Sequence, residues 1–215
     1  MTAYDALRHK MVVEQLARRG IRDVRVLDAM QRVPRDQFVP TELRDEAYED
    51  APQPIGHHQT ISQPYTVAFM AQEAQLTGTE RVLEVGTGSG YGAAVLSCLA
   101  DQVYTIERID TLYDEAWARL ARLGFRNVRV YHGDGSLGLA REAPFDAIVV
   151  TAGAEQLPEA YLQQLTDGGR IVIPIGTHGR QQMYRLTRRG DQWQQERLGS
   201  FGFVPLVEGD LPDDA

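Results

Sequence analysis

The chain has 215 residues, of which 43% are hydrophobic and 24% charged, proportions typical of a globular protein and not of a disordered one. Its net charge of −8 argues against a protein that binds nucleic acid, because such proteins need clustered positive charge. The longest apolar runs, such as Ile171 to Ile175, are too short to cross a bilayer, so no membrane span is expected.

The first third of the chain is predicted to be helical and rich in loops. Three helices are expected there: Tyr4 to Arg19, Val24 to Met30, and Pro64 to about Gln75. Gly20 is expected to end the first helix, and Pro64 to open the third, because proline is favoured in a first helical turn. Between them, the prolines and glycine from Pro40 to Ser62 predict an extended, loop-rich segment.

The remainder alternates between short apolar strands and helices. Strands are predicted at Arg81 to Val85, Val103 to Glu107, Val128 to Tyr131, Phe145 to Thr151 and Arg170 to Ile175. The intervening helices are predicted at Tyr91 to Leu99, Thr111 to Leu123 and Gln156 to Leu165. This alternation predicts an α/β fold with a Rossmann-like, doubly wound and mostly parallel sheet. Two last strands, Gln181 to Thr187 and Gln192 to Leu198, should form an antiparallel hairpin.

A glycine loop follows the first of these strands in the run Glu84-Val85-Gly86-Thr87-Gly88-Ser89-Gly90. Glycines let the backbone turn sharply and approach a ligand, and the next helix points its N–H groups at that ligand. Glu107 ends the second strand, where a carboxylate can accept hydrogen bonds from ribose hydroxyls. Asp134 follows the third strand, where it is both a turn residue and a candidate neighbour of an adenine.

Two other readings of the glycine loop remain open. A nicotinamide dehydrogenase needs G-x-G-x-x-G/A, which fails from Gly86 because Tyr91 occupies the last position. The pattern does fit from Gly88 to Ala93, although that frame begins too late for the tight turn after the strand. The second alternative is a loop that binds nothing.

The segment Thr60-Ile61-Ser62-Gln63-Pro64 leads from the loop into a proline-initiated helix. Hydroxyl groups near a helix N-terminus suit an anion, because free N–H groups and the helix dipole both favour negative charge. A simple capping role for Ser62 fits the spacing equally well.

The residues required for phosphoryl transfer on a P-loop, for a Schiff base and for metal binding are missing from the expected patterns. Lys10 is the only lysine and stands outside any G-x-x-x-x-G-K-[ST] pattern, so neither a P-loop nor a Schiff base is expected. His57 and His58 have no spaced Cys, His or Asp partners, so no metal is expected. Cys98 is expected in the core and, with no signal-peptide pattern at the N-terminus, agrees with a cytoplasmic protein. The pairs Arg18-Arg19 and Arg188-Arg189 are interpreted as solvated surface.

The segments around these motifs resemble a broad group of enzymes and, more closely, one family within that group. The Glu84 loop, Pro144 to Ile148 and Leu165 to Arg170 resemble Rossmann-like methyltransferases that use S-adenosylmethionine. The Thr60-Ile61-Ser62 motif closely resembles the signature of protein-L-isoaspartate O-methyltransferases. Matching pieces of that family are Val33-Pro34-Arg35, Phe38-Val39, His132-Gly133-Asp134-Gly135 and Gly202-Phe203-Val204-Pro205-Leu206. The resemblance extends from about Leu16 to Leu206.

The resemblance implies a division of the chain and a set of site residues. One domain, 1–215, would comprise a substrate-facing helical segment (1–80), a cofactor-binding core (81–175) and C-terminal antiparallel strands with a tail (176–215). Residues implied to bind S-adenosylmethionine are Glu84, Gly86, Thr87, Gly88, Glu107, Arg108, Asp134 and Gly135. Residues implied to bind substrate are Gln59, Thr60, Ile61, Ser62 and Val204, with Ser62 as the catalytic residue.

The implied reaction is methylation of the free α-carboxylate of an isoaspartyl residue in a damaged protein or peptide, which initiates repair. That carboxylate is already ionised near pH 7, so no general base is required. Two rivals remain: methylation of another acceptor, such as a small molecule or RNA, and a non-catalytic module that kept the fold. We expect a monomer, with no nucleic acid or membrane as partner.

Overall fold

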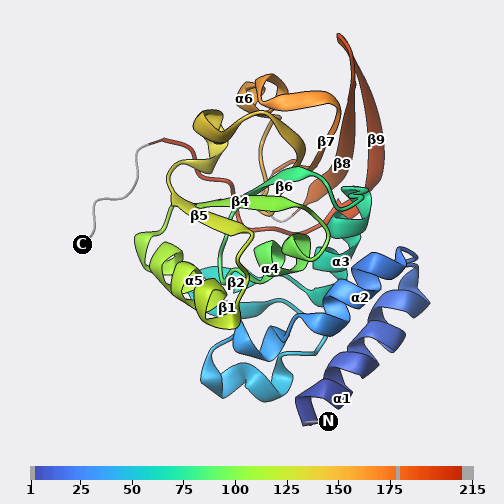
Figure 1. Cartoon of the computed structure of the whole chain (residues 1–215), viewed down its shortest axis with the longest axis vertical. Helices are drawn as coiled ribbons and strands as arrows, with labels where there is room; N and C mark the ends of the chain where they lie inside the picture. The colour runs from blue at the N-terminus through green and yellow to red at the C-terminus, as the bar shows by residue number, and fades with distance from the viewer. Residues whose placement is uncertain (1–2, 178–179, 210–215) are drawn as a thin grey trace.

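The computed structural model describes residues 3–177 and 180–209, which contain a seven-stranded sheet with helices on both faces (Figure 1). The strand order is β5-β4-β3-β6-β7-β8-β9. Strands β3 to β7 run parallel, whereas β8 is antiparallel to both β7 and β9. The predicted fold class, including the antiparallel end of the sheet, is therefore confirmed.

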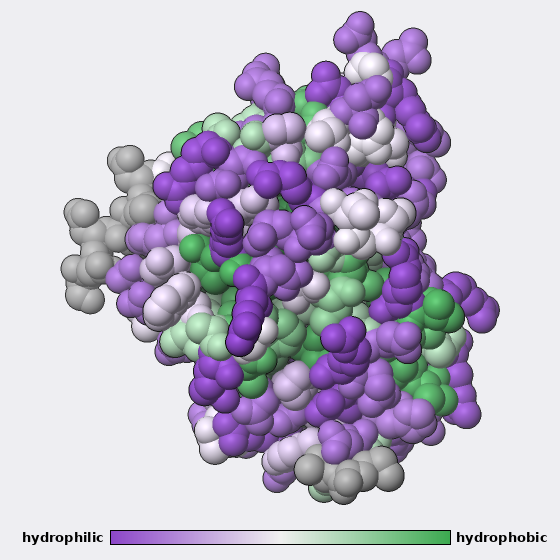
Figure 2. Space-filling view, viewed as in Figure 1, coloured by the Kyte–Doolittle hydropathy of each residue, from purple (hydrophilic) through white to green (hydrophobic). Residues whose placement is uncertain are grey.

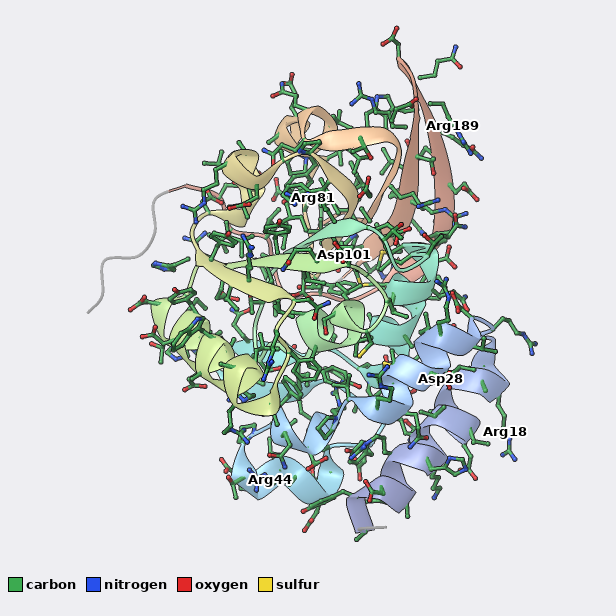
Figure 3. The ribbon with its side chains drawn as sticks, in the orientation of Figure 1. Arg18, Asp28, Arg44, Arg81, Asp101 and Arg189 are labelled. Carbon is green, nitrogen blue, oxygen red and sulfur yellow. The ribbon has the colours of Figure 1, made fainter. Side chains whose placement is uncertain are left out.

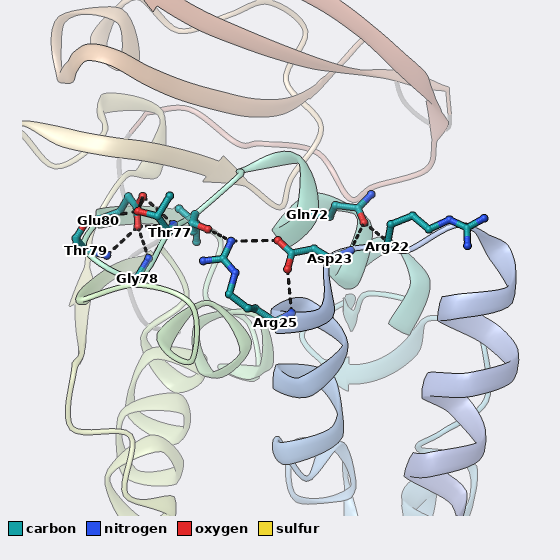
Figure 4. A network of polar contacts seen from close by, with 9 residues as sticks. Arg22, Asp23, Arg25, Gln72, Thr77, Gly78, Thr79 and Glu80 are labelled. Atoms are coloured by element: carbon teal, nitrogen blue, oxygen red, sulfur yellow. Dashed lines mark hydrogen bonds and ion pairs between the residues drawn. The ribbon is translucent and has the colours of Figure 1, made fainter.

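The N-terminal helical segment lies beside the sheet and is joined to helix α3 by polar contacts. It comprises α1 (Ala3–Lys10), a π-helical stretch (Met11–Leu16), a 3-10 turn (Ala17–Arg19) and α2 (Val24–Arg32). The first predicted helix is thus helical throughout, but it changes from α-helical to π-helical to 3-10 geometry along its length. It ends at Gly20, whose φ is +103°. Figure 4 shows Gln72 of α3 (Pro64–Glu73) accepting the backbone N–H groups of Arg22 and Asp23.

The segment predicted as a loop between Pro40 and Ser62 contains a small hairpin. Strands β1 (Gln53–Gly56) and β2 (Gln59–Ile61) pair antiparallel, and a 3-10 stretch (Thr41–Glu46) precedes them. The turn places His57 and His58 at positive φ, 49° and 56°. Side chains other than glycine rarely adopt that conformation, so the residue types did not indicate this turn.

The central strands and helices follow the predicted order. The strands are β3 (Arg81–Val85), β4 (Gln102–Glu107), β5 (Val128–His132), β6 (Phe145–Val150) and β7 (Leu165–Ile175). The helices are α4 (Tyr91–Ser97), α5 (Asp110–Leu123) and α6 (Glu159–Gln163). The predicted helix from Gln156 to Leu165 was too long, because Leu165 pairs with Phe145 and already belongs to β7.

The C-terminal hairpin extends the sheet beyond the parallel strands. It consists of β8 (Gln181–Arg189) and β9 (Gln192–Phe201), and in Figure 1 it projects past the other strands. After β9 the chain turns back and crosses the carboxyl ends of the parallel strands as segment 203–209. Residues 210–215 of the acidic tail lie outside the described residues.

Two hydrophobic clusters lie on the two faces of the sheet. Val82 and Val103 belong to the cluster packed against α1 to α4, whereas their neighbours Leu83 and Tyr104 belong to the cluster that contains Tyr161 of α6. Consecutive residues of a strand face opposite sides, so β3, β4 and β6 are buried on both faces, whereas β5 at the sheet edge is only partly covered. Cys98 is only half-buried at the end of α4, not fully buried as expected.

Charged groups cover much of the surface. The face in Figure 2 is largely hydrophilic, with hydrophobic residues in smaller groups among the polar ones. Arg18 and Arg189, labelled in Figure 3, are exposed and lie on separate parts of the chain. Within the described residues, no helix is both long and apolar enough to cross a membrane.

Candidate active site

The carboxyl ends of β3, β4 and β6 converge on a cavity, which we call the inner cavity. The strand order reverses at β3, whose neighbours β4 and β6 lie on its two sides. Ligands of open α/β sheets bind at such reversals, because the loops after the strands part there. The inner cavity is lined by residues of the glycine loop, of β2, of the β4 and β6 ends and of segment 203–209: Gln59 to Ser62, Glu84 to Ser89, Ile106 to Ile109, Gly135, Thr151 and Val204 to Val207.

The glycine loop forms as the sequence predicts, and Gly86 explains why glycine is needed. Its φ is +95°, and a Cβ added there would lie 2.5 Å from Oγ1 of Thr151. Thr151 in turn donates its hydroxyl to the carbonyl of Gly86 at 2.7 Å. A side chain at position 86 would therefore strain the backbone and break the contact between two strand ends.

Glu107 is held rigidly at the rim of the inner cavity. Its Oε2 accepts the N–H of Gly88 at 2.8 Å, and its Oε1 accepts those of Arg108 and Ile109 at 2.9 and 3.1 Å. The residue is only 6% exposed. A carboxylate has about four acceptor positions, so these bonds fix its orientation and leave capacity for a ligand hydroxyl.

Glu84 lies deeper, beneath the glycine loop. Burial raises the pKa of its carboxyl to about 8, although the hydroxyl of Thr105 donates to it at 2.6 Å and opposes that rise. Thr105 is also hydrogen-bonded to Thr87 at 2.7 Å, which links the carboxyl to the loop. The other oxygen of Glu84 lies against the Cα of Gly92, so that α4 can start close to β3.

Asp134 and Gly135 follow β5 at the far end of the cavity. Gly135 lines it, but Asp134 is not among the lining residues. The Asp134 carboxylate accepts the N–H and hydroxyl of Ser136 at 2.9 and 2.7 Å, and the N–H of Gly209 at 2.9 Å. Its side chain thus caps a 3-10 turn and anchors segment 203–209.

Segment 203–209 covers the site and is fastened along its length. The N–H of Gly153 donates to the carbonyl of Val204 at 2.7 Å, and the N–H of Leu206 donates to that of Gly153 at 2.7 Å. The Arg108 guanidinium donates to the carbonyl of Val207. Gln181, only 2% exposed, accepts the N–H of Phe203 at 2.9 Å.

A second, outer cavity adjoins the inner one. Four residues line both: Thr60, Ser62, Thr151 and Val204. Its remaining lining comes from the N-terminal segment, the start of α3 and the chain after β9: Arg19, Pro52, Gln63, Tyr65, Thr66, Ser200, Phe201, Gly202 and Phe203. A group bound in one cavity can therefore meet a group bound in the other beside Ser62.

The Ser62 hydroxyl is not the cap of α3. The capping position belongs to Gln63, and no side chain caps the helix. The N–H of Tyr65 is instead directed at Asp50, 3.3 Å away, so an acid of the chain itself occupies the start of the helix, where a ligand anion was expected. Among the described residues, no hydrogen-bond partner is found for the half-buried Ser62 hydroxyl.

Several lining residues of the two cavities were not predicted from the sequence, among them Thr151, Tyr91 and Arg19. Thr151 could have been found, because it directly follows β6 at the carboxyl edge of the sheet. Tyr91 is buried at the start of α4 and lines the inner cavity, with the guanidinium of Arg35 4.9 Å from its ring centroid. Arg19, interpreted as solvated surface, is indeed exposed, but it also lines the outer cavity. Only the fold brings Arg35 to Tyr91 and Arg19 to Ser62.

The described residues contain no group of three or more His, Cys, Asp or Glu side chains arranged to hold a metal ion. His57 and His58 lie exposed in the turn between β1 and β2. They therefore shape that hairpin.

Comparison with known proteins identifies the family. Residues 7–211 match the family model described as Protein-L-isoaspartate(D-aspartate) O-methyltransferase. The chain is 56% identical over 203 residues to protein-L-isoaspartate O-methyltransferase 2 of Marinobacter nauticus, which covers 94% of this chain and 93% of that one. It is 53% identical over 208 residues to protein-L-isoaspartate O-methyltransferase 1 of Rhodopseudomonas palustris, with 96% and 85% covered.

Solved structures agree. A protein-L-isoaspartate O-methyltransferase superposes with a TM-score of 0.82 at 28% identity, covering 95% of this chain and 67% of that one. A structure from Plasmodium falciparum in complex with S-adenosyl-L-homocysteine superposes with a TM-score of 0.80 at 28% identity, covering 94% and 99%. The chain belongs to the protein-L-isoaspartate(D-aspartate) O-methyltransferase family and is an S-adenosylmethionine-dependent methyltransferase.

Proposed function

We propose that methyl transfer to the free α-carboxylate of an isoaspartyl residue takes place where the two cavities meet. The observation that carries this proposal is the set of four residues common to both cavities, with the unpartnered hydroxyl of Ser62 among them. The cofactor would occupy the inner cavity and the damaged peptide the outer one. The chain thus acts as a protein-L-isoaspartate O-methyltransferase and initiates repair of damaged proteins.

The residues that line the inner cavity support S-adenosylmethionine as its ligand. The glycine loop offers a cradle that a Cβ at Gly86 would disrupt, and Glu107 keeps an acceptor position for a ribose hydroxyl. We assign Gly86, Thr87 and Gly88 to the methionine side. We assign Gly135, which also lines the cavity, to the adenine side. Bound there, the cofactor supplies a methyl group activated by its positive sulfonium.

Three of the expected cofactor residues also hold other parts of the cavity wall in place. The carboxylate of Asp134 holds Gly209, and the guanidinium of Arg108 holds Val207. Glu84 lines the cavity from beneath the loop, where it supports Thr105 and Gly92. We therefore assign Asp134 and Glu84 to positioning the cavity walls.

The protein's task at the acceptor is to position a nucleophile that is already ionised. Carboxyl groups have ordinary pKa values of about 3.3–4.3, so the substrate carboxylate needs no base at neutral pH. Ser62 would donate a hydrogen bond to it, Thr60 and Ile61 would shape its pocket, and Gln59 and Val204 would line the approach. Alignment and exclusion of water then supply the rate enhancement.

The remaining assignments concern the whole molecule. We propose one domain, because the segments 1–80, 81–175 and 176–215 all contribute to the two cavities. A monomer is supported by exposed hydrophobic residues that are scattered over separate elements, among them Val24, Trp117 and Leu137. The single, half-buried cysteine supports a cytoplasmic location, and the net charge of −8 supports the absence of a nucleic-acid partner.

The decisive experiment compares two synthetic peptides that differ only in isoaspartate versus aspartate at one position. Methyl transfer from radiolabelled S-adenosylmethionine should label the isoaspartyl peptide alone, and the label should be released by mild base, as expected of a methyl ester. Equal labelling of both peptides, or base-stable label, would contradict the proposed acceptor. Cofactor binding by calorimetry without labelling of either peptide would favour another acceptor or a non-catalytic module.

A further inference from the structure

The outer cavity carries one charged side chain among its described lining residues, that of Arg19. The other lining residues are uncharged: they are aromatic, hydroxylic, amide or aliphatic. Arg19 is the last residue of the 3-10 turn Ala17–Arg19, just before Gly20 turns the chain. In a protein with a net charge of −8, a lone cation facing the substrate cavity has a specific consequence for which peptides bind.

The Arg19 guanidinium is held in place from two sides. Its central carbon lies 4.0 Å from the ring centroid of Tyr65, a stacking arrangement that guanidinium groups favour. One of its Nη groups forms an ion pair with Asp50. The Arg19 side chain nevertheless stays 45% exposed, so it is positioned without being buried.

Asp50 lies behind Arg19 and does not itself line the cavity. Its carboxylate also accepts the side-chain amide of Gln63 at 2.7 Å and faces the N–H of Tyr65 at 3.3 Å. These contacts hold the acid against the start of α3. The guanidinium has five N–H donors, and the described residues give its Nε and Nη2 groups no hydrogen bond. The unused donors are thus available to a bound ligand.

We propose that Arg19 is a specificity-determining residue that binds a second carboxylate of the substrate, close in sequence to the isoaspartyl residue. This proposal rests on the proposed function. A planar fork of N–H donors matches a carboxylate, and the outer cavity presents no competing negative side chain among its described lining residues. The second carboxylate is the side chain of a nearby acidic residue or the C-terminus of a short damaged peptide.

The test uses matched isoaspartyl peptides with one Glu, or one Gln, placed in turn at each position up to three residues before or after the isoaspartate. A second arm compares a free C-terminal acid with a C-terminal amide. For the unmodified protein, at least one Glu peptide or the free acid should show a KM roughly three- to tenfold below that of its neutral counterpart. Raising the salt concentration should shrink this ratio, because the site is partly exposed.

The variant is Arg19→Gln, and the matched control is Arg18→Gln. Arg18 is the adjacent residue, is exposed, and points away from the fold in Figure 3. Arg19→Gln should abolish the ratio between acidic and neutral peptides, and Arg18→Gln should preserve it. If Arg19 only braced the loop through Asp50, both peptides would weaken alike and the ratio would survive.

A surviving ratio in Arg19→Gln, or no ratio in the unmodified protein, overturns the proposal. Should Arg19→Gln fail to fold, Arg19→Lys keeps the charge but not the fork, and a ratio unchanged in that variant and insensitive to salt also overturns it. The neutral isoaspartyl peptide separates the proposed role of Arg19 from the proposed function of the protein. If the unmodified protein methylates it, the proposed function holds whatever Arg19 does; if no isoaspartyl peptide is methylated, both fall.

Discussion

Glu107→Gln tests whether the carboxylate at the end of β4 holds the cofactor. The change keeps the size of the side chain but replaces one acceptor oxygen by an NH2 group. In the structure both oxygens are in use, Oε2 by the N–H of Gly88 and Oε1 by those of Arg108 and Ile109. Either orientation of the amide therefore sets a donor against a backbone donor.

The lower-cost orientation keeps the pair at Oε1 and points the NH2 group at Gly88. It loses one hydrogen bond to the glycine loop and removes the negative charge that a ribose hydroxyl would meet. A hydrogen bond to a charged group contributes about 1.5–3 kcal/mol, so binding of the cofactor should weaken roughly 10- to 150-fold. The loss should appear mainly in cofactor Kd, because Glu107 lies away from the outer cavity.

The assay is calorimetric titration of S-adenosyl-L-homocysteine into each variant, with circular dichroism to verify the fold. Glu115→Gln is the matched control: it removes the same charge from the exposed side of α5, where Glu115 forms an ion pair with Arg119 at 3.5 Å. A Kd for Glu107→Gln within threefold of the unmodified protein would refute the reasoning. So would an equal loss in Glu115→Gln, because the effect would then be one of net charge.

Three further variants separate the other parts of the site. Ser62→Ala should lower kcat/KM for an isoaspartyl peptide roughly 10- to 150-fold, because a hydrogen bond to the substrate carboxylate is lost. Calorimetry should show an unchanged cofactor Kd, and a parallel loss of cofactor binding would contradict this assignment. Gln181→Leu leaves the buried N–H of Phe203 unpaired, so urea denaturation should show a free energy of unfolding lower by about 1–3 kcal/mol. The peptide KM should rise as well, and an unaltered KM would mean that segment 203–209 does not depend on this anchor. Glu84, whose pKa is raised from 4.5 to about 8, binds its proton more tightly folded than unfolded, so its contribution to stability falls as pH rises through that window. Glu84→Gln keeps an acceptor for Thr105 but has no proton to lose. As pH rises from 5.5 to 7.5, its free energy of unfolding should increase by about 1–3 kcal/mol relative to that of the unmodified protein, and parallel pH profiles would refute this.

The elements predicted most accurately are those whose own residues settle the outcome. β3 begins at Arg81 and ends at Val85 as expected, because a short apolar run that meets a glycine loop leaves no other place for a buried strand to end. The hairpin at Gly190 was recognised from its turn residues, although both strands proved longer. Local signals of this kind need no knowledge of the rest of the chain.

The errors occur where tertiary pairing decides. Leu165 reads as the end of an amphipathic helix, but it pairs with Phe145, and the backbone N–H of Phe145 donates to Gln164 at 2.9 Å. The β1–β2 hairpin was missed because His57 and His58 adopt positive φ, for which histidine carries little signal. In the first case a contact with a distant strand overrides the local preference, and in the second two short strands pair across a turn whose residue types carry little signal.

The site divides in the same way. Gly86 and Glu107 were predicted because each follows or ends a recognisable strand, and the carboxyl ends of parallel strands meet at one edge. Ser62 was predicted from the resemblance of Thr60-Ile61-Ser62 to the family signature. The hydrogen-bond partners of these residues could not be predicted, since Gly88 reaches Glu107 only through the twist of two neighbouring strands. Arg19 was interpreted as surface, because nothing in its neighbours indicates that the chain after β9 faces it.

Segment 203–209 gives a physical reason why the cofactor and substrate sites should depend on one another. Val204 to Val207 form a wall of the inner cavity, and Phe203 and Val204 form a wall of the outer one. The same segment is fastened by Asp134 and Arg108, residues next to the cofactor cavity. A displacement of either anchor would move a wall of both cavities, so substitutions at Asp134 should affect peptide binding as well as cofactor binding. A residue whose only role was to contact adenine would change the cofactor Kd alone, and that difference distinguishes an anchor from a ligand.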